Sequence, residues 1–182
     1  MSDKPVGAGM FQVNEDEEIW GLNRRFILFS NALFTNIFER METILGPVAK
    51  RQIYEVGYSS GKLGAERLKP IFNGGIEQFK QHVNLSQSLG WGKITKVEYD
   101  EKTGVAALEY PNTWESEGYK ELLGDKSPGV VTCFMSAGIA AGAISGALDV
   151  EYECEEELCV SKGDDICRFV LTPMGEKRKV IR

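Results

Sequence analysis

The sequence predicts a single α+β domain in which helices come first and an antiparallel sheet follows. Two observations carry this prediction. In the first half of the chain, apolar residues recur every three or four positions, which is the spacing of helices with one buried face. In the second half, short β-leaning runs are joined by short polar turns, which connect antiparallel neighbours. We therefore expect several helices packed on one antiparallel sheet.

The helices of the first half can be placed from their punctuation. Apolar residues at intervals of three and four predict an amphipathic helix from Ser30 to Leu45, and Gly46-Pro47 ends it and starts another. The second helix runs from Pro47 to Leu68, and Pro70 closes it. Its glycines, among them Gly57 and Gly64, lie on one face and allow a neighbouring helix to approach closely. This surface, with the phenylalanine-rich helix before it, predicts a homodimer.

The second half begins with a weaker helix over residues 76–89. WGKITKVEY and VAALEYP follow as two β-leaning runs around the turn DEKTG, which indicates a hairpin. Ser127-Pro128 then supplies a helix cap and a first-turn proline for an uncharged segment, residues 129–148. After it, VEYECEE, LCVS and ICRFVLT are predicted to be strands.

The uncharged segment 129–148 is long enough to cross a bilayer, so its composition has to decide. Twelve of its twenty residues are Gly, Ala, Ser or Thr, which leaves a weak driving force for insertion. Glycines at every fourth position, 138, 142 and 146, serve a tightly packed buried helix as well as a membrane dimer. We therefore predict a core helix and no membrane span.

Length and composition fit one globular domain. The 182 residues are 42% hydrophobic and 26% charged, enough for one core. We expect a loose arm over residues 1–18, the domain over 19–174 and a basic tail over 175–182. The N-terminus lacks the features of a secretory signal, which predicts a cytoplasmic location. A net charge of −6 argues against direct nucleic-acid binding, because that affinity rests largely on Lys and Arg.

Three of the four cysteines fall within fourteen residues and raise the possibility of a metal site. Cys159 and Cys167 flank the turn KGDD, so a hairpin can bring both sulfurs together. Cys154 and Glu156 lie two apart on one strand face, and Cys133 lies near a helix start, where the helix dipole favours thiolate. Zinc accepts three sulfurs with one carboxylate, or four sulfurs. A redox switch and simple packing in a core are the alternatives for these thiols.

The run AGIAAGAISGALDVEYECEEELCVSKGDDICRFVLTP, residues 137–173, resembles the 4-vinyl reductase domain family. METILG and AKRQIYEVGYSSGKLGAERL upstream are also similar to this family, so the resemblance covers about residues 24–173. It implies a fold shared with NO-signalling domains and with Golgi-transport subunits that bind a lipid chain. It also implies membership among sensors, tetrapyrrole-pathway accessories or redox-responsive regulators.

The resemblance extends to the site residues. In similar sensor domains of aromatic-responsive bacterial activators, zinc is bound by a helix cysteine, a glutamate and two cysteines. The matching positions here are Cys133, Glu156, Cys159 and Cys167, with Cys154 as an additional thiol that offers an alternative to the glutamate.

The similar sensors also hold a phenolic hydroxyl between a histidine and an aromatic residue at the end of a hairpin. His82 and Tyr110 match these places, although Tyr110 stands where the sensors commonly have tryptophan. A single histidine on a helix is by itself more typical of a surface or capping residue. Trp91 and Trp114 are further candidates for the pocket wall, or else ordinary core aromatics.

The function that follows is a zinc-stabilised binding module, a sensor or carrier, for a small hydrophobic or aromatic molecule. One alternative is a thiol redox sensor that uses Cys154 and the metal cysteines. Another is a tetrapyrrole-pathway enzyme accessory or reductase, which the absence of a dinucleotide fingerprint makes less favoured. The chain has no room for the ATPase and DNA-binding modules of the activators, which predicts a stand-alone module.

Overall fold

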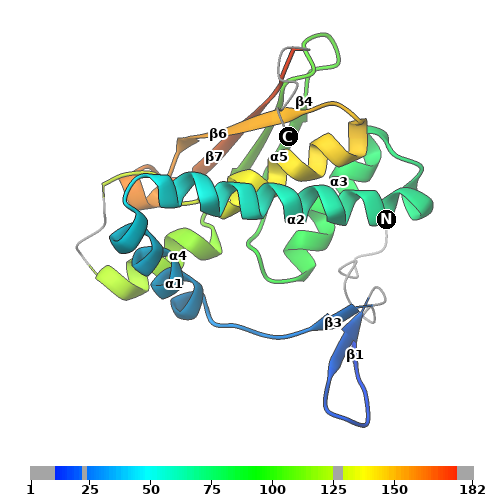
Figure 1. Cartoon of the computed structure of the whole chain (residues 1–182). Coiled ribbons are helices and arrows are strands. Elements are labelled where there is room, and N and C mark those ends of the chain that lie inside the picture. Colours follow the sequence, from blue (N-terminus) through cyan, green and yellow to red (C-terminus); the bar gives the residue numbers. More distant parts are fainter. Residues whose placement is uncertain (1–10, 22–23, 125–128, 176–182) are drawn as a thin grey trace.

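The computed structural model describes residues 11–21, 24–124 and 129–175. It contains a small N-terminal sheet, five α-helices and a larger sheet (Figure 1). The elements are β1 (Phe11–Val13), β2 (Ile19–Gly21), β3 (Arg24–Phe26), α1 (Asn31–Leu45), α2 (Val48–Phe72), α3 (Gly75–Ser88), β4 (Lys96–Tyr99), β5 (Ala106–Tyr110), α4 (Trp114–Leu123), α5 (Phe134–Leu148), β6 (Tyr152–Leu158), the 3₁₀ turn η1 (Val160–Lys162) and β7 (Cys167–Pro173).

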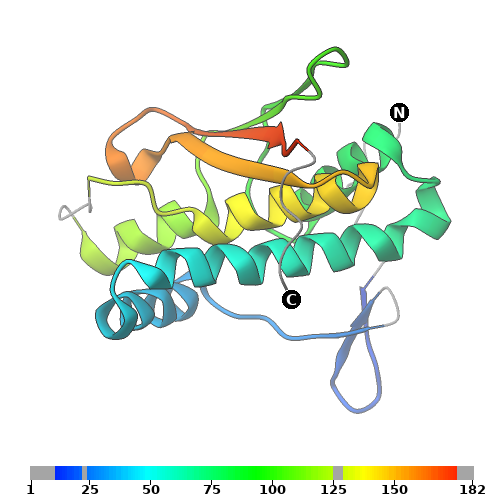
Figure 2. The ribbon, with the colours of Figure 1, turned by 45° about the horizontal axis from the view of Figure 1, so that its top comes forward.

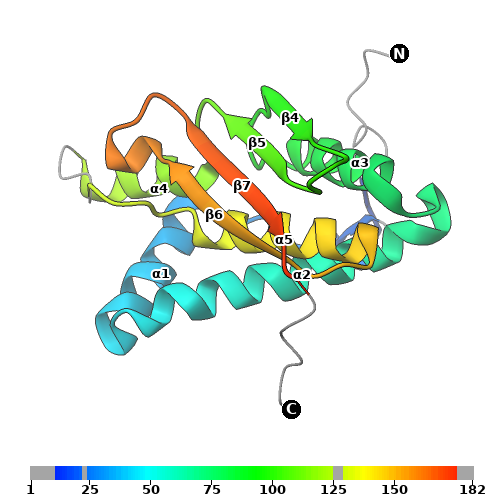
Figure 3. The same ribbon diagram turned by 90° about the horizontal axis from the view of Figure 1, so that it is seen from above.

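Three layers make up the body of the molecule. The larger sheet is antiparallel throughout, with the strand order β4-β5-β7-β6. Helix α5 packs beneath this sheet, and α2 lies on the other side of α5 (Figures 2 and 3). This architecture confirms the predicted α+β class with an antiparallel sheet.

Glycines allow α5 and α2 to pack with their backbones in contact. A Cβ atom on Gly142 would lie 2.0 Å from the carbonyl oxygen of Tyr58, and one on Gly61 would lie 2.2 Å from that of Ile139. Each added methyl group would therefore overlap main-chain atoms of the facing helix. The uncharged segment is a core helix, as predicted, and within the described residues no helix is both long and apolar enough to span a bilayer.

The same packing bears on the predicted homodimer. Gly57, which was expected to leave room for a partner, faces the Met135 carbonyl oxygen of α5 within the same chain. The glycine face of α2 is thus occupied by α5 along this stretch. Dimerisation stays a prediction that rests on the exposed apolar side chains of α1 and α2, such as Ile37, Ile44 and Val56.

Two predicted helix ends were wrong. Helix α2 continues through Pro70 to Phe72 and ends at Asn73, whose backbone is left-handed (φ 60°). A proline this close to the end removes one hydrogen bond of the last turn, and the Asn73 N–H still reaches the Lys69 carbonyl oxygen at 2.8 Å. Helix α5 begins at Phe134 and not at residue 129. Ser127 and Pro128 lie outside the described residues.

The start of α5 is fixed by a buried carboxylate from another helix. Glu115 of α4 accepts the backbone N–H groups of Met135 (2.9 Å) and Ser136 (3.1 Å), so it caps the first turn of α5. Burial raises the pKa of Glu115 to about 8. No sequence-local signal marks a cap that comes from twenty residues upstream.

Three further segments differ from expectation. Residues 11–13, placed in the loose arm, form strand β1, because they pair with β2 in an antiparallel ladder. Residues 159–161, expected to extend a strand, lead into the 3₁₀ turn η1. Helix α4 was not predicted, although Thr113 and Ser116 form a capping box at its start. Residues 1–10 of the expected arm, and the tail beyond residue 175, lie outside the described part of the chain.

Candidate functional site

Four side chains with metal-binding atoms converge where α5 begins. We call them the thiol–carboxylate cluster: Cys133, Glu156, Cys159 and Cys167. One sulfur or carboxylate oxygen from each lies within 4.8 Å of the corresponding atoms of the other three. Cys133 is the residue that caps α5, Glu156 lies on β6, and Cys167 opens β7. The four residues named from the resemblance are therefore together in space.

The connection between β6 and β7 brings two of the sulfurs together. Asp164 accepts the backbone N–H of Cys159 at 2.9 Å, and its own N–H donates to the Cys159 carbonyl oxygen at 3.1 Å. Gly163 takes a left-handed conformation (φ 108°), which suits glycine. This tight turn places Cys159 beside Cys167 and corresponds to the KGDD motif of the sequence.

Charge and burial in the cluster are unbalanced without a cation. All three cysteines are buried, and the Cys133 and Cys159 sulfurs are 3.8 Å apart. Hydrogen bonds from the Cys133 and Cys167 thiols lower the pKa of Cys159. Burial raises the pKa of Glu156 to about 8.

One carboxylate oxygen shows what the cluster lacks. The Oε2 atom of Glu156 accepts the Cys133 backbone N–H at 3.0 Å, but its Oε1 atom is buried and has no hydrogen-bond partner in the described protein. A buried carboxylate oxygen without a partner is costly, and a metal ion would satisfy it. Three sulfurs and one oxygen within this distance fit the tetrahedral preference of zinc.

Cys154 lies outside the cluster. It precedes Glu156 by two residues on β6, and its backbone N–H donates to the Tyr54 hydroxyl at 3.0 Å. Burial raises the pKa of its thiol well above the ordinary value. Of the two side chains considered for the fourth position, Glu156 is in the four-residue group and Cys154 is not.

A second candidate site lies between α3, the β4–β5 hairpin and α5. His82, Trp91 and Tyr110 line one cavity here, which we call the histidine pocket; its other walls are mostly apolar side chains of α3, β5 and α5. Its volume is about 30 Å³. A cavity that takes up benzene has about 150 Å³, so the pocket as it stands is too small for an aromatic ring.

His82 is held in an apolar setting. Its Nδ1 atom is buried and has no hydrogen-bond partner in the described protein. Burial lowers the pKa of the imidazole to about 4, so the ring is neutral near pH 7. Its Cε1 atom lies 2.8 Å from where a Cβ on Gly64 would be, so the glycine of α2 makes room for it. The neutral ring offers one donor and one acceptor, whichever tautomer is present.

Tyr110 connects the two candidate sites. It lines the histidine pocket and pairs with Cys167 across the β5–β7 ladder, so both side chains lie on the same face of the sheet. Its ring meets Phe169 edge-on, with ring centroids 5.5 Å apart. Burial raises the pKa of its hydroxyl above the ordinary value.

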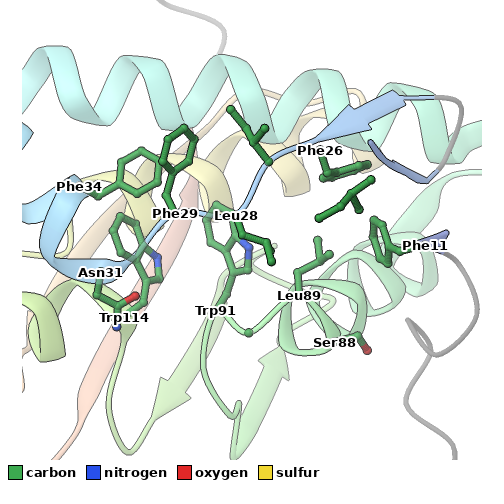
Figure 4. Close-up of a pocket in the computed structure, with 13 residues that line it drawn as sticks. Phe11, Phe26, Leu28, Phe29, Asn31, Phe34, Ser88, Leu89, Trp91 and Trp114 are labelled. Atoms are coloured by element: carbon green, nitrogen blue, oxygen red, sulfur yellow. The ribbon is translucent and has the colours of Figure 1, made fainter. Parts of the chain in front are cut away.

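Two larger cavities adjoin the histidine pocket, and no pattern in the sequence indicates either of them. One has a volume of about 720 Å³ and lies between β3, α2 and α3. The other, of about 510 Å³, is an aromatic cavity between the N-terminal sheet, the segment before α1 and the end of α3 (Figure 4). Trp91 lines all three cavities, whereas Trp114 lines only the aromatic one and packs against Trp91 with centroids 5.9 Å apart.

Comparison with known proteins gives a family match and a set of similar folds. Residues 128–173 match the model of the 4-vinyl reductase domain. The chain is 25% identical over 167 residues to the phenol regulator MopR of Acinetobacter guillouiae; the match covers 87% of this chain and 29% of that protein. The chain thus spans less than a third of that relative's length.

Among solved structures, the chain resembles the phenol-responsive sensory domain of the transcription activator PoxR with phenol. That match has a TM-score of 0.75 and 22% identity, and covers 94% of this chain and 88% of that one. It also resembles an H-NOX protein from S. oneidensis, with a TM-score of 0.53, 12% identity and coverage of 82% and 78%. The expected resemblance is therefore confirmed: residues 128–173 match the 4-vinyl reductase domain, and the chain has the fold of the phenol-responsive sensory domain.

Proposed function

We propose that this chain is a small-molecule sensor domain for an aromatic or hydrophobic ligand, with a zinc ion bound structurally at the thiol–carboxylate cluster. The observation that carries the proposal is the buried, unpaired Nδ1 atom of His82 in a mostly apolar pocket beside Tyr110. Similarity to two phenol-sensing proteins, MopR in sequence and PoxR in fold, supports the same class of ligand.

A ligand hydroxyl is the group that suits this pocket. Ligand sites are mostly apolar with a few polar groups that fix orientation, and here His82 and Tyr110 would be those groups. The neutral imidazole can donate to or accept from a hydroxyl, and the ligand would give a partner to a nitrogen that now has none. A hydroxylated aromatic molecule therefore gains more from this site than its apolar counterpart.

Entry of the ligand requires the histidine pocket to widen, and Trp91 is the side chain placed to allow it. Trp91 separates the pocket from both larger cavities and lies between Gly90 (φ 84°) and Gly92 (φ 124°). Glycines with positive φ permit backbone conformations that other residues rarely adopt. Displacement of the indole would join the 30 Å³ pocket to a neighbouring cavity.

The zinc ion in this proposal has a structural role. Three thiolates and one carboxylate complete a tetrahedral set, so no position remains for a water molecule. The ion would join the start of α5 to β6 and β7, the elements that carry Cys133, Glu156 and Cys167. A closed site of this kind supports a binding domain better than it supports an enzyme.

Calorimetry with phenol and toluene tests the proposal. Phenol should bind to the wild-type protein, and His82→Ala should weaken it roughly 5- to 150-fold, because one hydrogen bond to a buried group is lost. Toluene, which lacks the hydroxyl, should lose much less. Asn84→Ala, on the exposed side of α3, is the matched control and should leave phenol affinity unchanged. Equal phenol affinity for wild type and His82→Ala would refute the assignment of His82.

A further inference from the structure

The 720 Å³ cavity beside the histidine pocket carries two guanidinium groups, and we call it the arginine groove. Arg24 comes from β3 and Arg67 from α2, so two separate elements direct a positive charge to one cavity. The remaining wall is mostly apolar. It includes Phe26, Leu68, Leu85 and Ile139.

The charge of this groove differs from that of the rest of the chain. No Asp or Glu is found among the described residues that line it, although the whole chain carries a net charge of −6. Neither Arg24 nor Arg67 forms an ion pair within the described ranges 11–21, 24–124 and 129–175. Arg25, the next residue along β3, pairs with Glu18 at 2.8 Å.

The groove is continuous with the proposed ligand site. His82, Ser86, Trp91 and Ile139 line both the arginine groove and the histidine pocket. Arg67 follows Gly64 by three residues on α2, which is nearly one helical turn, and Gly64 is the residue packed against His82. A molecule anchored at His82 can therefore extend along α2 toward the arginine side chains.

We propose that the ligand is an amphipathic anion, with a hydroxylated aromatic end at His82, an apolar body in the groove and a carboxylate held by Arg24 and Arg67. This inference rests on the proposed sensor function and narrows its ligand class. The planar guanidinium fork matches carboxylate oxygens in geometry and charge. A groove of about 720 Å³ also fits a molecule considerably larger than phenol.

The probes for a test are 6-(4-hydroxyphenyl)hexanoate and its methyl ester, which differ only in the charge of one end. Calorimetry at low ionic strength should show tighter binding of the acid, and added salt should weaken the acid only. Arg24→Gln and Arg67→Gln should each weaken the acid about threefold to tenfold, since the side chains are exposed, and leave the ester nearly unchanged. Arg25→Gln is the matched control and should change neither affinity.

The outcomes separate this inference from the function beneath it. Equal affinity for acid and ester, with no effect of either arginine substitution, would overturn the anionic ligand and leave the sensor domain standing. Binding of phenol but of neither longer probe would do the same. Failure of phenol and both probes to bind the folded wild-type protein would overturn both proposals. His82→Ala should weaken acid and ester by the same factor, in contrast to the arginine variants.

Discussion

The thiol–carboxylate cluster and the histidine pocket each contain a buried polar atom without a partner in the described protein, but their surroundings differ. Oε1 of Glu156 lies among three thiols, all within 4.8 Å, whereas Nδ1 of His82 lies in a mostly apolar wall. A cation suits the first atom, because every neighbouring group is a potential anion. A hydrogen-bonding group on an otherwise apolar molecule suits the second. The same local deficit thus points to two kinds of occupant.

The two sites also differ in how far they are closed. The cysteines of the cluster are fully buried, while the histidine pocket borders on two cavities of 510 and 720 Å³. They are nevertheless neighbours, because Tyr110 and Cys167 pair across β5 and β7. We expect the cluster to hold the sheet and α5 in place while the Trp91 side of the pocket opens.

The largest effect should come from the closed site. Cys159→Ser should abolish metal binding and lower the free energy of unfolding by about 3 to 5 kcal/mol, because a structural metal contributes directly to folding. For a chain of this size, the melting temperature should fall by about 10 °C. Metal analysis and thermal unfolding of the same sample would measure both.

Cys154→Ala is the control for that substitution, since it removes a partly buried thiol outside the cluster. It should keep one zinc per chain. A wild-type protein that is stable, reduced and free of metal would contradict the metal assignment, and loss of zinc from Cys154→Ala would restore Cys154 as a ligand.

A smaller effect should follow from removing only the charge of the carboxylate. Glu156→Gln should lower zinc affinity at least about tenfold, the size of effect seen even for groups that merely support a ligand. Glu155→Gln is the matched control, because its side chain is exposed on the opposite face of β6. Competition with a chelator would rank the two variants, and equal zinc affinities would remove Glu156 from the ligand set.

The sequence predicted most of the C-terminal half because its signals are local. The β4–β5 hairpin, the strands β6 and β7 and the buried glycine helix α5 all follow from patterns within about twenty residues. Cys159 and Cys167 could be paired from the turn between them. Bringing Cys133 into the same cluster required the resemblance, because it depends on how α5 packs on the sheet.

Features set by residues distant in sequence were harder to predict. The start of α5 depends on Glu115 of another helix, and strands β1 to β3 are only three residues each. The pairing of His82 with Tyr110 came from the resemblance alone. Arg24 and Arg67 carry no pattern that indicates a shared cavity; only the folded chain brings them together.

His82 is the only histidine in the chain, so its ¹⁵N signals can be followed without ambiguity. We predict that the imidazole of the free protein stays neutral until the pH approaches about 4, because burial lowers its pKa, and that phenol shifts its nitrogen resonances until the site is saturated. Toluene should cause smaller shifts. A histidine that titrates near its ordinary pKa of 6.5, with resonances that saturating phenol leaves unchanged, would contradict the assignment of this pocket as the ligand site.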